Sequence, residues 1–324
     1  MANVNIVADI GGTNMRVAIS HADSTPSHIE VFQCADYQGI EQVLSTYIEN
    51  QGLNGKRINA CLAIACPVDQ DLITMTNLPW QFSQSALKEA LKLNQLHLIN
   101  DYTAIAHAIP LLSDTQKVQI GEGIAVVGRP ISICGPGTGL GVANVIPVDD
   151  KWVSLGGEGG HVDYAPTTEL EIKVLNYLLG KYEHVSYEQL LSGLGIEQIH
   201  QALWFIENGI ELTDKLSAQQ ISSKATDGSC ELCKNALMQF CAVLGSFAGN
   251  LALTLGSFGG VYIAGGIVPR FIEFIENSEF RARFEAKGRL SSFNKDIPTF
   301  VVTESQPGLI GASAYLQQCN KEEL

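Results

Sequence analysis

The sequence is poor in charged residues, and most of those present are acidic. Only 17% of its 324 residues are charged and 7% are aromatic, and 20 Lys and Arg stand against 34 Asp and Glu, which gives a formal net charge of −14. A protein with this charge repels nucleic acid and anionic membrane surfaces, so the composition argues against both as partners. A polyanion would have to be bound by local devices, namely backbone N–H groups, helix N-termini and a metal ion.

Two recognisable signals are also missing. The N-terminal residues lack the basic region, apolar core and cleavage site of a secretion signal, so we expect a cytoplasmic protein. Of the eight cysteines only Cys230 and Cys233 have a CxxC spacing, and no second such pair or close pair of histidines accompanies them. Since a structural zinc site needs four ligands, packing in a helix is the favoured interpretation of this pair.

Residues 235–268 contain no charged side chain at all. The length would suffice for a membrane-spanning helix. However, the stretch includes Gln239 and Asn250, and it ends in a short apolar run bounded by glycines. These features predict a central helix that is buried on all sides, followed by a buried strand. The spacing of Gly245 and Gly249 would let another element pack closely against that helix.

The most informative feature that is present is a glycine-rich turn that occurs twice. The first reads Asp9-Ile10-Gly11-Gly12-Thr13 and the second Gly135-Pro136-Gly137-Thr138-Gly139, each between two apolar runs. Each pattern predicts a strand, a turn and another strand. Because glycine has no side chain, backbone N–H groups in such turns can converge on an anion. Neither is a P-loop, since no Lys-Ser/Thr follows and a strand comes next. Two such turns indicate a nucleotide-using protein with a duplicated architecture.

Strand and helix signals alternate along the chain, which predicts an α/β fold with two lobes and a cleft between them. We expect a small domain at residues 1–110, with residues 301–324 packing back on it, and a large domain at residues 111–300. Strands are predicted at residues 30–34, 59–65, 97–100 and 298–303. Helices are predicted at residues 39–50, from Ser83 or Ser85 to Leu93, and at residues 103–108, 169–179, 187–191, 195–208, 230–255, 269–277 and 308–317.

Two acidic residues in the first half are candidates for chemistry. Asp9 precedes the first glycine turn, where a carboxylate could hold Mg²⁺ against ATP phosphates; alternatively it is a turn residue. Asn100 and Asp101 lie between a predicted strand and a predicted helix. Asp101 is the candidate general base, because a carboxylate can remove the proton of a sugar hydroxyl; alternatively it is only a helix N-cap.

A polar cluster flanked by glycines suggests a polyol site. Glu158 and His161 are its candidate ligands, because a carboxylate can accept hydrogen bonds from two neighbouring hydroxyls. The alternative is a metal site to which Asp163 could contribute, but the loop lacks the usual ligand spacing. Glu188 is expected in the first turn of a helix capped by Ser186, either as a ligand or as a surface residue.

Two loops complete the candidates. Asn77 could bind a hydroxyl, although a loop asparagine is commonly a turn residue. Gly265 and Gly266 end an apolar run and precede Pro269, so that an adenine or ribose could lie on their backbone; a tight strand-to-helix turn is the alternative.

These residues together resemble the bacterial glucokinases of the non-zinc group, within the actin/hexokinase/Hsp70-like superfamily. The resemblance runs nearly from end to end, and its most specific strings are Ala63-Ile64-Ala65-Cys66-Pro67, Met75-Thr76-Asn77, Ile99-Asn100-Asp101, Gly137-Thr138-Gly139-Leu140-Gly141, Gly157-Glu158-Gly159-Gly160-His161-Val162-Asp163 and Ile263-Ala264-Gly265-Gly266-Ile267-Val268-Pro269-Arg270. Pro136 is a departure, because a small residue is usual there.

The resemblance implies a duplicated ribonuclease H-like fold with mixed sheets, a homodimer, and ATP-dependent phosphorylation of glucose at its 6-hydroxyl. It implies that Asp101 is the base, that ATP phosphates lie at Ala8, Asp9, Ile10, Gly11, Gly12 and Thr13, and that the sugar is bound by Asn100, Glu158, His161 and Glu188. A kinase for another hexose remains an alternative, as does a non-enzymatic ATP- or sugar-binding regulator. A regulator would need a DNA-binding segment before the first strand, which begins at Val4.

Overall fold

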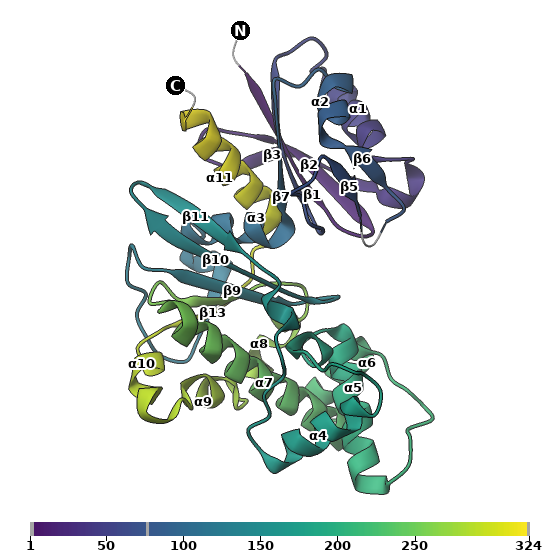
Figure 1. The fold of residues 1–324 in the computed structure, drawn as a ribbon, viewed down its shortest axis with the longest axis vertical. Helices are drawn as coiled ribbons and strands as arrows, with labels where there is room; N and C mark the ends of the chain where they lie inside the picture. Colours follow the sequence, from purple (N-terminus) through teal and green to yellow (C-terminus); the bar gives the residue numbers. More distant parts are fainter. Residues whose placement is uncertain (1–2, 76–77, 323–324) are drawn as a thin grey trace. The chain divides into compact units, whose positions relative to one another are not determined.

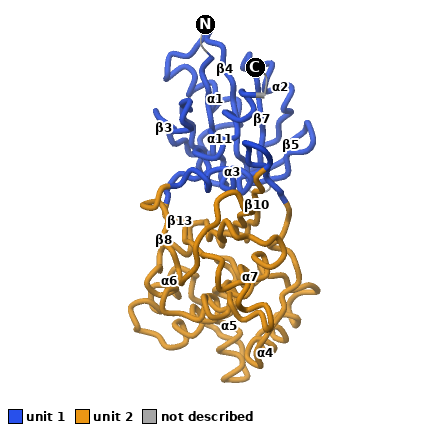
Figure 2. Tube along the Cα trace, turned by 90° about the vertical axis from the view of Figure 1, so that its left-hand side faces the viewer, with its two compact units in different colours: residues 1–112, 148–156, 304–324 blue, residues 113–147, 157–303 orange. Residues whose placement is uncertain are grey.

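The structure, a computed structural model, describes residues 3–75 and 78–322. The chain divides into two compact units, drawn in two colours in Figure 2. Unit 1 comprises residues 1–112, 148–156 and 304–324, and unit 2 comprises residues 113–147 and 157–303. Both are α/β, as predicted (Figure 1).

Unit 1 is built on a five-stranded mixed sheet in the order β3-β2-β1-β4-β7. The first glycine turn joins two antiparallel strands, as predicted, and the two strands that follow in the sheet run parallel to β1. All residues of β4 are buried, because both faces of this central strand are covered. The strands are β1 (Val4–Ile10), β2 (Asn14–Ser20), β3 (Pro26–Gln33), β4 (Ile58–Ile64) and β7 (Gln95–Asn100), and a separate small hairpin contains β5 (Leu72–Thr74) and β6 (Gln81–Ser83).

The helices of unit 1 are α1 (Ile40–Asn50), α2 (Gln84–Ala90), α3 (Asp101–Ala108) and α11 (Pro307–Glu322). The end of the chain returns to this unit, where α11 packs on α3, β1 and β4. Small side chains permit the close approach: a Cβ on Gly311 would lie 1.6 Å from the carbonyl oxygen of Ala104. The face of the sheet beneath α11 packs with α3 and α11 into a separate hydrophobic core, which contains Val7, Ala18, Cys61, Ala63, Ile99, Ala104, Leu309, Ala312 and Leu316.

A six-stranded mixed sheet, in the order β11-β10-β9-β12-β13-β8, repeats the same pattern. The second glycine turn joins antiparallel β9 and β10, and β12 lies parallel to β9. The antiparallel pair followed by a parallel neighbour thus occurs in both sheets, which agrees with the predicted duplication. The strands are β8 (Lys117–Ile120), β9 (Ile131–Pro136), β10 (Leu140–Val148), β11 (Lys151–Gly156), β12 (Val261–Ile263) and β13 (Thr299–Val302), of which β11 is counted with unit 1.

The helices of unit 2 surround α7, which contacts α5, α6 and α9 (Figure 1). Among the described residues α7 is the one helix long and apolar enough to cross a membrane, and it is mostly buried inside the unit, as predicted for a core helix. A Cβ on Gly245 would lie 2.1 Å from the carbonyl oxygen of Phe280, so the close contact predicted for this glycine is made with α9. The helices are α4 (Glu169–Leu179), α5 (Gly193–Asn208), α6 (Ala218–Thr226), α7 (Glu231–Leu255), α8 (Ile272–Glu276), α9 (Phe280–Glu285) and α10 (Ser291–Lys295).

Some predicted boundaries are wrong. The helix expected at residues 187–191 is only a 3₁₀ turn, Tyr187–Gln189, because α5 begins directly after it with Ser192 as its N-cap. The helix expected at residues 269–277 is a 3₁₀ turn, Val268–Phe271, followed by α8. The cap of α2 is Ser83, whose hydroxyl accepts from the backbone N–H of Ala86. The polar helix α6 was not predicted.

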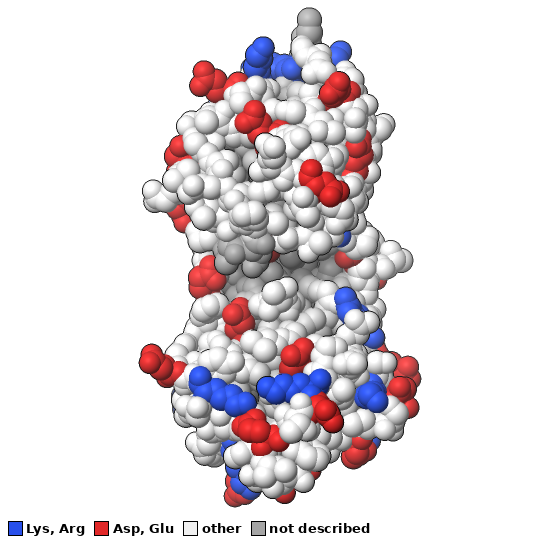
Figure 3. Space-filling view, turned by 90° about the vertical axis from the view of Figure 1, so that its right-hand side faces the viewer, with Lys and Arg blue, Asp and Glu red and all other residues white. Residues whose placement is uncertain are grey.

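Figure 3 shows how charged side chains are distributed on one face of the molecule. On the face in Figure 3, acidic and basic groups lie among each other. The excess of acidic residues in the sequence is therefore distributed on this face and is not gathered at one place.

Candidate functional site

In unit 1 the carboxylate of Asp9 lies at the end of β1, directly before the first glycine turn. The turn is closed by a hydrogen bond of 3.0 Å from the backbone N–H of Gly11 to the carbonyl oxygen of Asn14. The nearest cation is Arg16, whose Nη1 is 3.9 Å from Oδ2 of Asp9. The first turn of α11 also packs against the Asp9 carboxylate, because a Cβ on Gly308 would lie 2.8 Å from Cγ of Asp9.

Burial raises the pKa of Asp9 to about 6, the Arg16 charge opposes this shift and the nearby Asp101 carboxylate adds to it. The two carboxylates therefore repel each other, and both burial and this repulsion disfavour the charged form of Asp9. A divalent cation between or beside such groups would relieve both costs, because Mg²⁺ is bound by one or two carboxylates together with substrate phosphates.

Asp101 is the first residue of α3, and its neighbour is the cap. Oδ1 of Asn100 accepts from the backbone N–H groups of Tyr102 at 2.9 Å and Thr103 at 3.4 Å. Asp101 also accepts from Tyr102 N–H, at 3.0 Å. The alternative that Asp101 is only the N-cap is therefore wrong, since Asn100 has that position.

In unit 2 the second glycine turn contacts two other candidate segments. The backbone N–H of Gly193, at the start of α5, donates to the carbonyl oxygen of Gly137 over 2.9 Å. Gly265 has a φ of 101°, and a Cβ there would lie 2.7 Å from the carbonyl oxygen of Pro136. Glycine is needed at this position for both its left-handed φ and the close approach. Pro136, where the sequence differs from the pattern of bacterial glucokinases, therefore lies against Gly265.

Glu188 is fixed directly to this turn. Its Oε2 accepts from the backbone N–H of Leu140 at 2.8 Å, and a Cβ on Gly139 would lie 2.5 Å from the same oxygen. Its other oxygen, Oε1, is 3.8 Å from Nε2 of His161. Unit 2 therefore brings together Gly139, His161 and Glu188, and the partly exposed carboxylate of Glu188 is held against the turn.

The remaining residues of the polar cluster are placed by the backbone. Glu158 is exposed, and its carbonyl oxygen accepts from the backbone N–H of His161 at 3.0 Å. Gly160 has no room for a side chain, because a Cβ would lie 2.1 Å from the carbonyl oxygen of Leu140. Asp163 pairs with His184, whose Nε2 is 2.7 Å from its Oδ1. Within residues 3–75 and 78–322, no group of three or more His, Cys, Asp or Glu side chains is placed to hold a metal ion.

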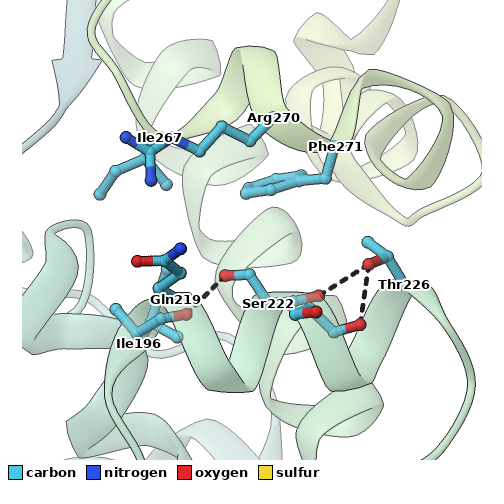
Figure 4. A pocket seen from close by; sticks show the side chains of 9 residues that line it. Ile196, Gln219, Ser222, Thr226, Ile267, Arg270 and Phe271 are labelled. Carbon is cyan, nitrogen blue, oxygen red and sulfur yellow. Dashed lines mark hydrogen bonds between the residues drawn. The ribbon is translucent and has the colours of Figure 1, made fainter.

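A pocket of about 270 Å³ lies between α6 and the segment that directly follows Gly266 (Figure 4). The apolar side chains of Ile267 and Phe271 lie on one side together with Arg270, and Gln219 and Ser222 of α6 lie opposite. The hydroxyl of Ser222 donates to the carbonyl oxygen of Ala218 within the helix. An apolar wall that faces polar groups suits a flat heterocycle, whose faces are apolar and whose edge makes hydrogen bonds.

The sequence did not point to the pocket as a whole. Only Gly265 and Gly266 were proposed near it, whereas the wall formed by α6 was missed. A signal was available, because Ser217 and Gln220 form a capping box in which both reciprocal hydrogen bonds are present. Nor did the sequence point to Gly308, whose contact with Asp9 joins residues from opposite ends of the chain.

The other predicted residues are distributed as follows. Ala8 and Ile10 lie in β1 with their side chains fully buried, so only their backbone could reach a ligand. Asn77 lies outside the described residues. Unit 1 contains Ala8, Asp9, Ile10, Gly11, Gly12, Thr13, Asn100 and Asp101, and unit 2 contains Gly137, Thr138, Gly139, Glu158, His161, Glu188, Gly265 and Gly266.

Comparison with known proteins gives the family. The glucokinase family model matches residues 6–319. A glucokinase from Colwellia psychrerythraea is 60% identical over 97% of this chain and 96% of its own length. The chain belongs to the glucokinase family. A crystal structure of glucokinase from an Antarctic psychrotroph is 38% identical, with a TM-score of 0.89 over 98% of this chain and all of that one.

A more distant structure shares the fold. It is a glucokinase of the ROK family from Streptomyces griseus in complex with glucose and AMPPNP, 16% identical with a TM-score of 0.63 over 97% of this chain and 99% of that one. The likeness confirms the predicted sugar-kinase fold with its mixed sheets, although at this identity it shows nothing about activity.

Proposed function

We propose that this chain transfers the terminal phosphoryl group of ATP to the 6-hydroxyl of D-glucose. Membership of the glucokinase family supports the reaction. The single observation that carries it is the attachment of Glu188 to the second glycine turn, because a carboxylate that can accept from sugar hydroxyls is held by the N–H of Leu140. An acceptor for a polyol and a turn suited to phosphates are thereby joined in one unit.

The nucleotide is proposed to lie along unit 2. Adenine fits the pocket between α6 and the Ile267 wall, and the ribose lies toward Gly265 and Gly266. The second glycine turn, including Gly137, Thr138 and Gly139, continues from that place, since Gly265 contacts Pro136. In unit 1 the first turn, from Ala8 to Thr13, is proposed to offer backbone N–H groups to ATP phosphates.

Asp9 is the residue proposed to hold Mg²⁺. Its donor chemistry fits, because the carboxyl is a hard oxygen ligand whose charge is disfavoured by burial and by Asp101. When bound, Mg²⁺ neutralises the negative charge of the phosphates. The contribution of the chain is to position this carboxylate, which the first turn of α11 and Arg16 both contact.

Asp101 is proposed as the general base, with Asn100 holding it in place by capping α3. As the 6-hydroxyl oxygen attacks, its proton passes to an oxygen of the Asp101 carboxylate. Asn100, Asn77, Glu158, His161 and Glu188 are proposed to orient the sugar through its hydroxyl groups. Positioned bases of this kind contribute roughly 10²- to 10⁴-fold to the rate.

The test is ADP release from ATP with a panel of hexoses, with and without Mg²⁺, for the parent and for Asp101→Asn. We expect glucose to be the preferred substrate, and the variant to lose roughly 10²- to 10⁴-fold in kcat with an unchanged melting curve. Asp163→Asn is the control, because this carboxylate is exposed and pairs with His184. Turnover of Asp101→Asn near that of the parent would remove Asp101 from the role, and preference for another hexose would change the substrate.

The resemblance to bacterial glucokinases also leads us to propose a homodimer. Sedimentation equilibrium of the full chain measures this directly, and a concentration-independent monomer mass would contradict it.

A further inference from the structure

The two cysteines of the CxxC sequence lie at the N-terminus of α7. Cys230 is the N-cap residue, and its Sγ accepts from the backbone N–H of Cys233 at 3.3 Å. Its exposure is intermediate, whereas Cys233 is fully buried. The proposed function makes no use of either residue.

The side chains of the two cysteines also influence each other. The Cys233 side chain and the backbone N–H of Cys233, which donates to Cys230 Sγ, lower the pKa of Cys230. Burial and the neighbouring sulfur raise the pKa of Cys233 to about 12. One partner is therefore a partly exposed sulfur whose thiolate form is favoured relative to a free thiol, and the other is a buried thiol that keeps its proton. The charge of Lys224 further favours the thiolate at Cys230.

We propose that Cys230 and Cys233 form an oxidisable dithiol that peroxide converts to an intramolecular disulfide. The Cys230 thiolate attacks one oxygen of hydrogen peroxide, which gives a sulfenic acid and, with one proton, water. The sulfur of Cys233 then attacks the sulfenic sulfur, its proton leaves with the hydroxyl group as a second water, and the S–S bond forms. The two thiols lose two electrons in total and the peroxide gains them. Residues three apart at the start of a helix lie close enough for this bond.

The other cysteines lack this combination of features. Cys34, Cys61, Cys66, Cys134 and Cys241 are buried, and burial raises the pKa of each. Cys319 is the best comparison, because its exposure is intermediate like that of Cys230. It lies in α11 next to Cys61, whose pKa is raised well above the usual value. Cys319 lies near the C-terminal end of α11, whereas Cys230 is the N-cap residue of α7.

The test treats the reduced full chain with limiting hydrogen peroxide, blocks the remaining thiols and maps the tryptic peptides. Cleavage after Lys224 and Lys234 gives one peptide, residues 225–234, that contains both cysteines. We expect this peptide to lose two hydrogens before Cys319 reacts, and to recover them with dithiothreitol. A second measurement follows the rate of iodoacetamide alkylation of Cys230 against pH, with an expected midpoint below the value of about 8.5 of a free thiol.

Three variants make the result decisive. Cys230→Ser keeps a side chain that can cap α7, so the fold is retained while the oxidised peptide should not form. Cys233→Ala removes the second sulfur, and peroxide should then add oxygen to Cys230 without loss of two hydrogens. Cys319→Ser is the matched control, and it should leave the formation of the disulfide unchanged. Oxidation of Cys319 before the peptide of residues 225–234, or an alkylation midpoint of Cys230 at or above that of a free thiol, would overturn the proposal.

Discussion

Replacing Gly139 by alanine tests the link between the second glycine turn and the sugar site. A Cβ at this position would lie 2.5 Å from Oε2 of Glu188, and ordinary contact begins at 3.4 Å, so the carboxylate would have to withdraw by about 0.9 Å. Its hydrogen bond to Leu140 N–H is 2.8 Å long. A displacement of this size brings the two atoms to a separation at which a hydrogen bond no longer forms.

The magnitude follows from that lost bond. A hydrogen bond to a charged group contributes about 1.5–3 kcal/mol, which corresponds to roughly a 10- to 150-fold change in an equilibrium constant. The Glu188 side chain is 32% exposed, so water replaces part of the interaction. We therefore expect the lower end of this range, about a tenfold rise in KM for glucose.

The assay is ADP release at saturating ATP with glucose varied, combined with a double-mutant cycle. In a Glu188→Ala background the clash is absent, so Gly139→Ala should have no further effect on KM for glucose. Gly39→Ala is the control, because a Cβ there meets nothing within 4 Å and the backbone is extended. Equal effects of Gly139→Ala in both backgrounds would refute the reasoning that the alanine acts through Glu188.

Two further predictions concern stability. The pKa of Asp9 is about 6 in the folded chain against 3.8 ordinarily, so the folded state holds this proton more tightly and stability falls as pH rises from about 4 to 6. Asp9→Asn should remove that loss, so the substitution should raise the free energy of unfolding at pH 8 by up to about 3 kcal/mol more than it does at pH 4. The same variant should lose Mg²⁺-dependent turnover. If the free energy of unfolding, measured with denaturant, changes with pH in the same way for parent and variant, the prediction is contradicted. Gly311→Ala should lower the melting temperature, because a Cβ 1.6 Å from the carbonyl oxygen of Ala104 forces α11 away from α3. Overpacking costs about 1–3 kcal/mol, whereas alanine gains only about 1 kcal/mol in helix propensity. An unchanged or higher melting temperature would show that α11 can move away from α3 without loss of stability.

Local features of the fold could be predicted from the sequence. The two glycine turns and their flanking strands need only neighbouring residues, and both hairpins are confirmed. The core position of α7 could also be predicted, because a long stretch without charge leaves no exposed face. The N-cap of α3 was harder, since Asn100 and Asp101 are both good capping residues and only the end of β7 decides between them.

Contacts between distant residues could not be predicted. Glu188 is 48 residues from Leu140, and no local pattern indicates that its carboxylate accepts from that N–H. The residue type suggested that Glu188 is a ligand. Its position beside Gly139, however, depends on how β10 packs against the turn before α5. The contact of Gly308 with Asp9 has the same origin, because α11 must fold onto β1 before the two residues meet.

The return of α11 to unit 1 has a consequence for the order of folding. Val7, Ala18 and Ala63 share a core with Leu309 and Leu316, and the residues of unit 2 separate these two groups in the sequence. During synthesis this apolar face of the N-terminal sheet is therefore covered by α11 only after unit 2 has been translated. Unit 1 can complete its core no earlier than that, so the unit whose chain begins first is not the first that can finish folding.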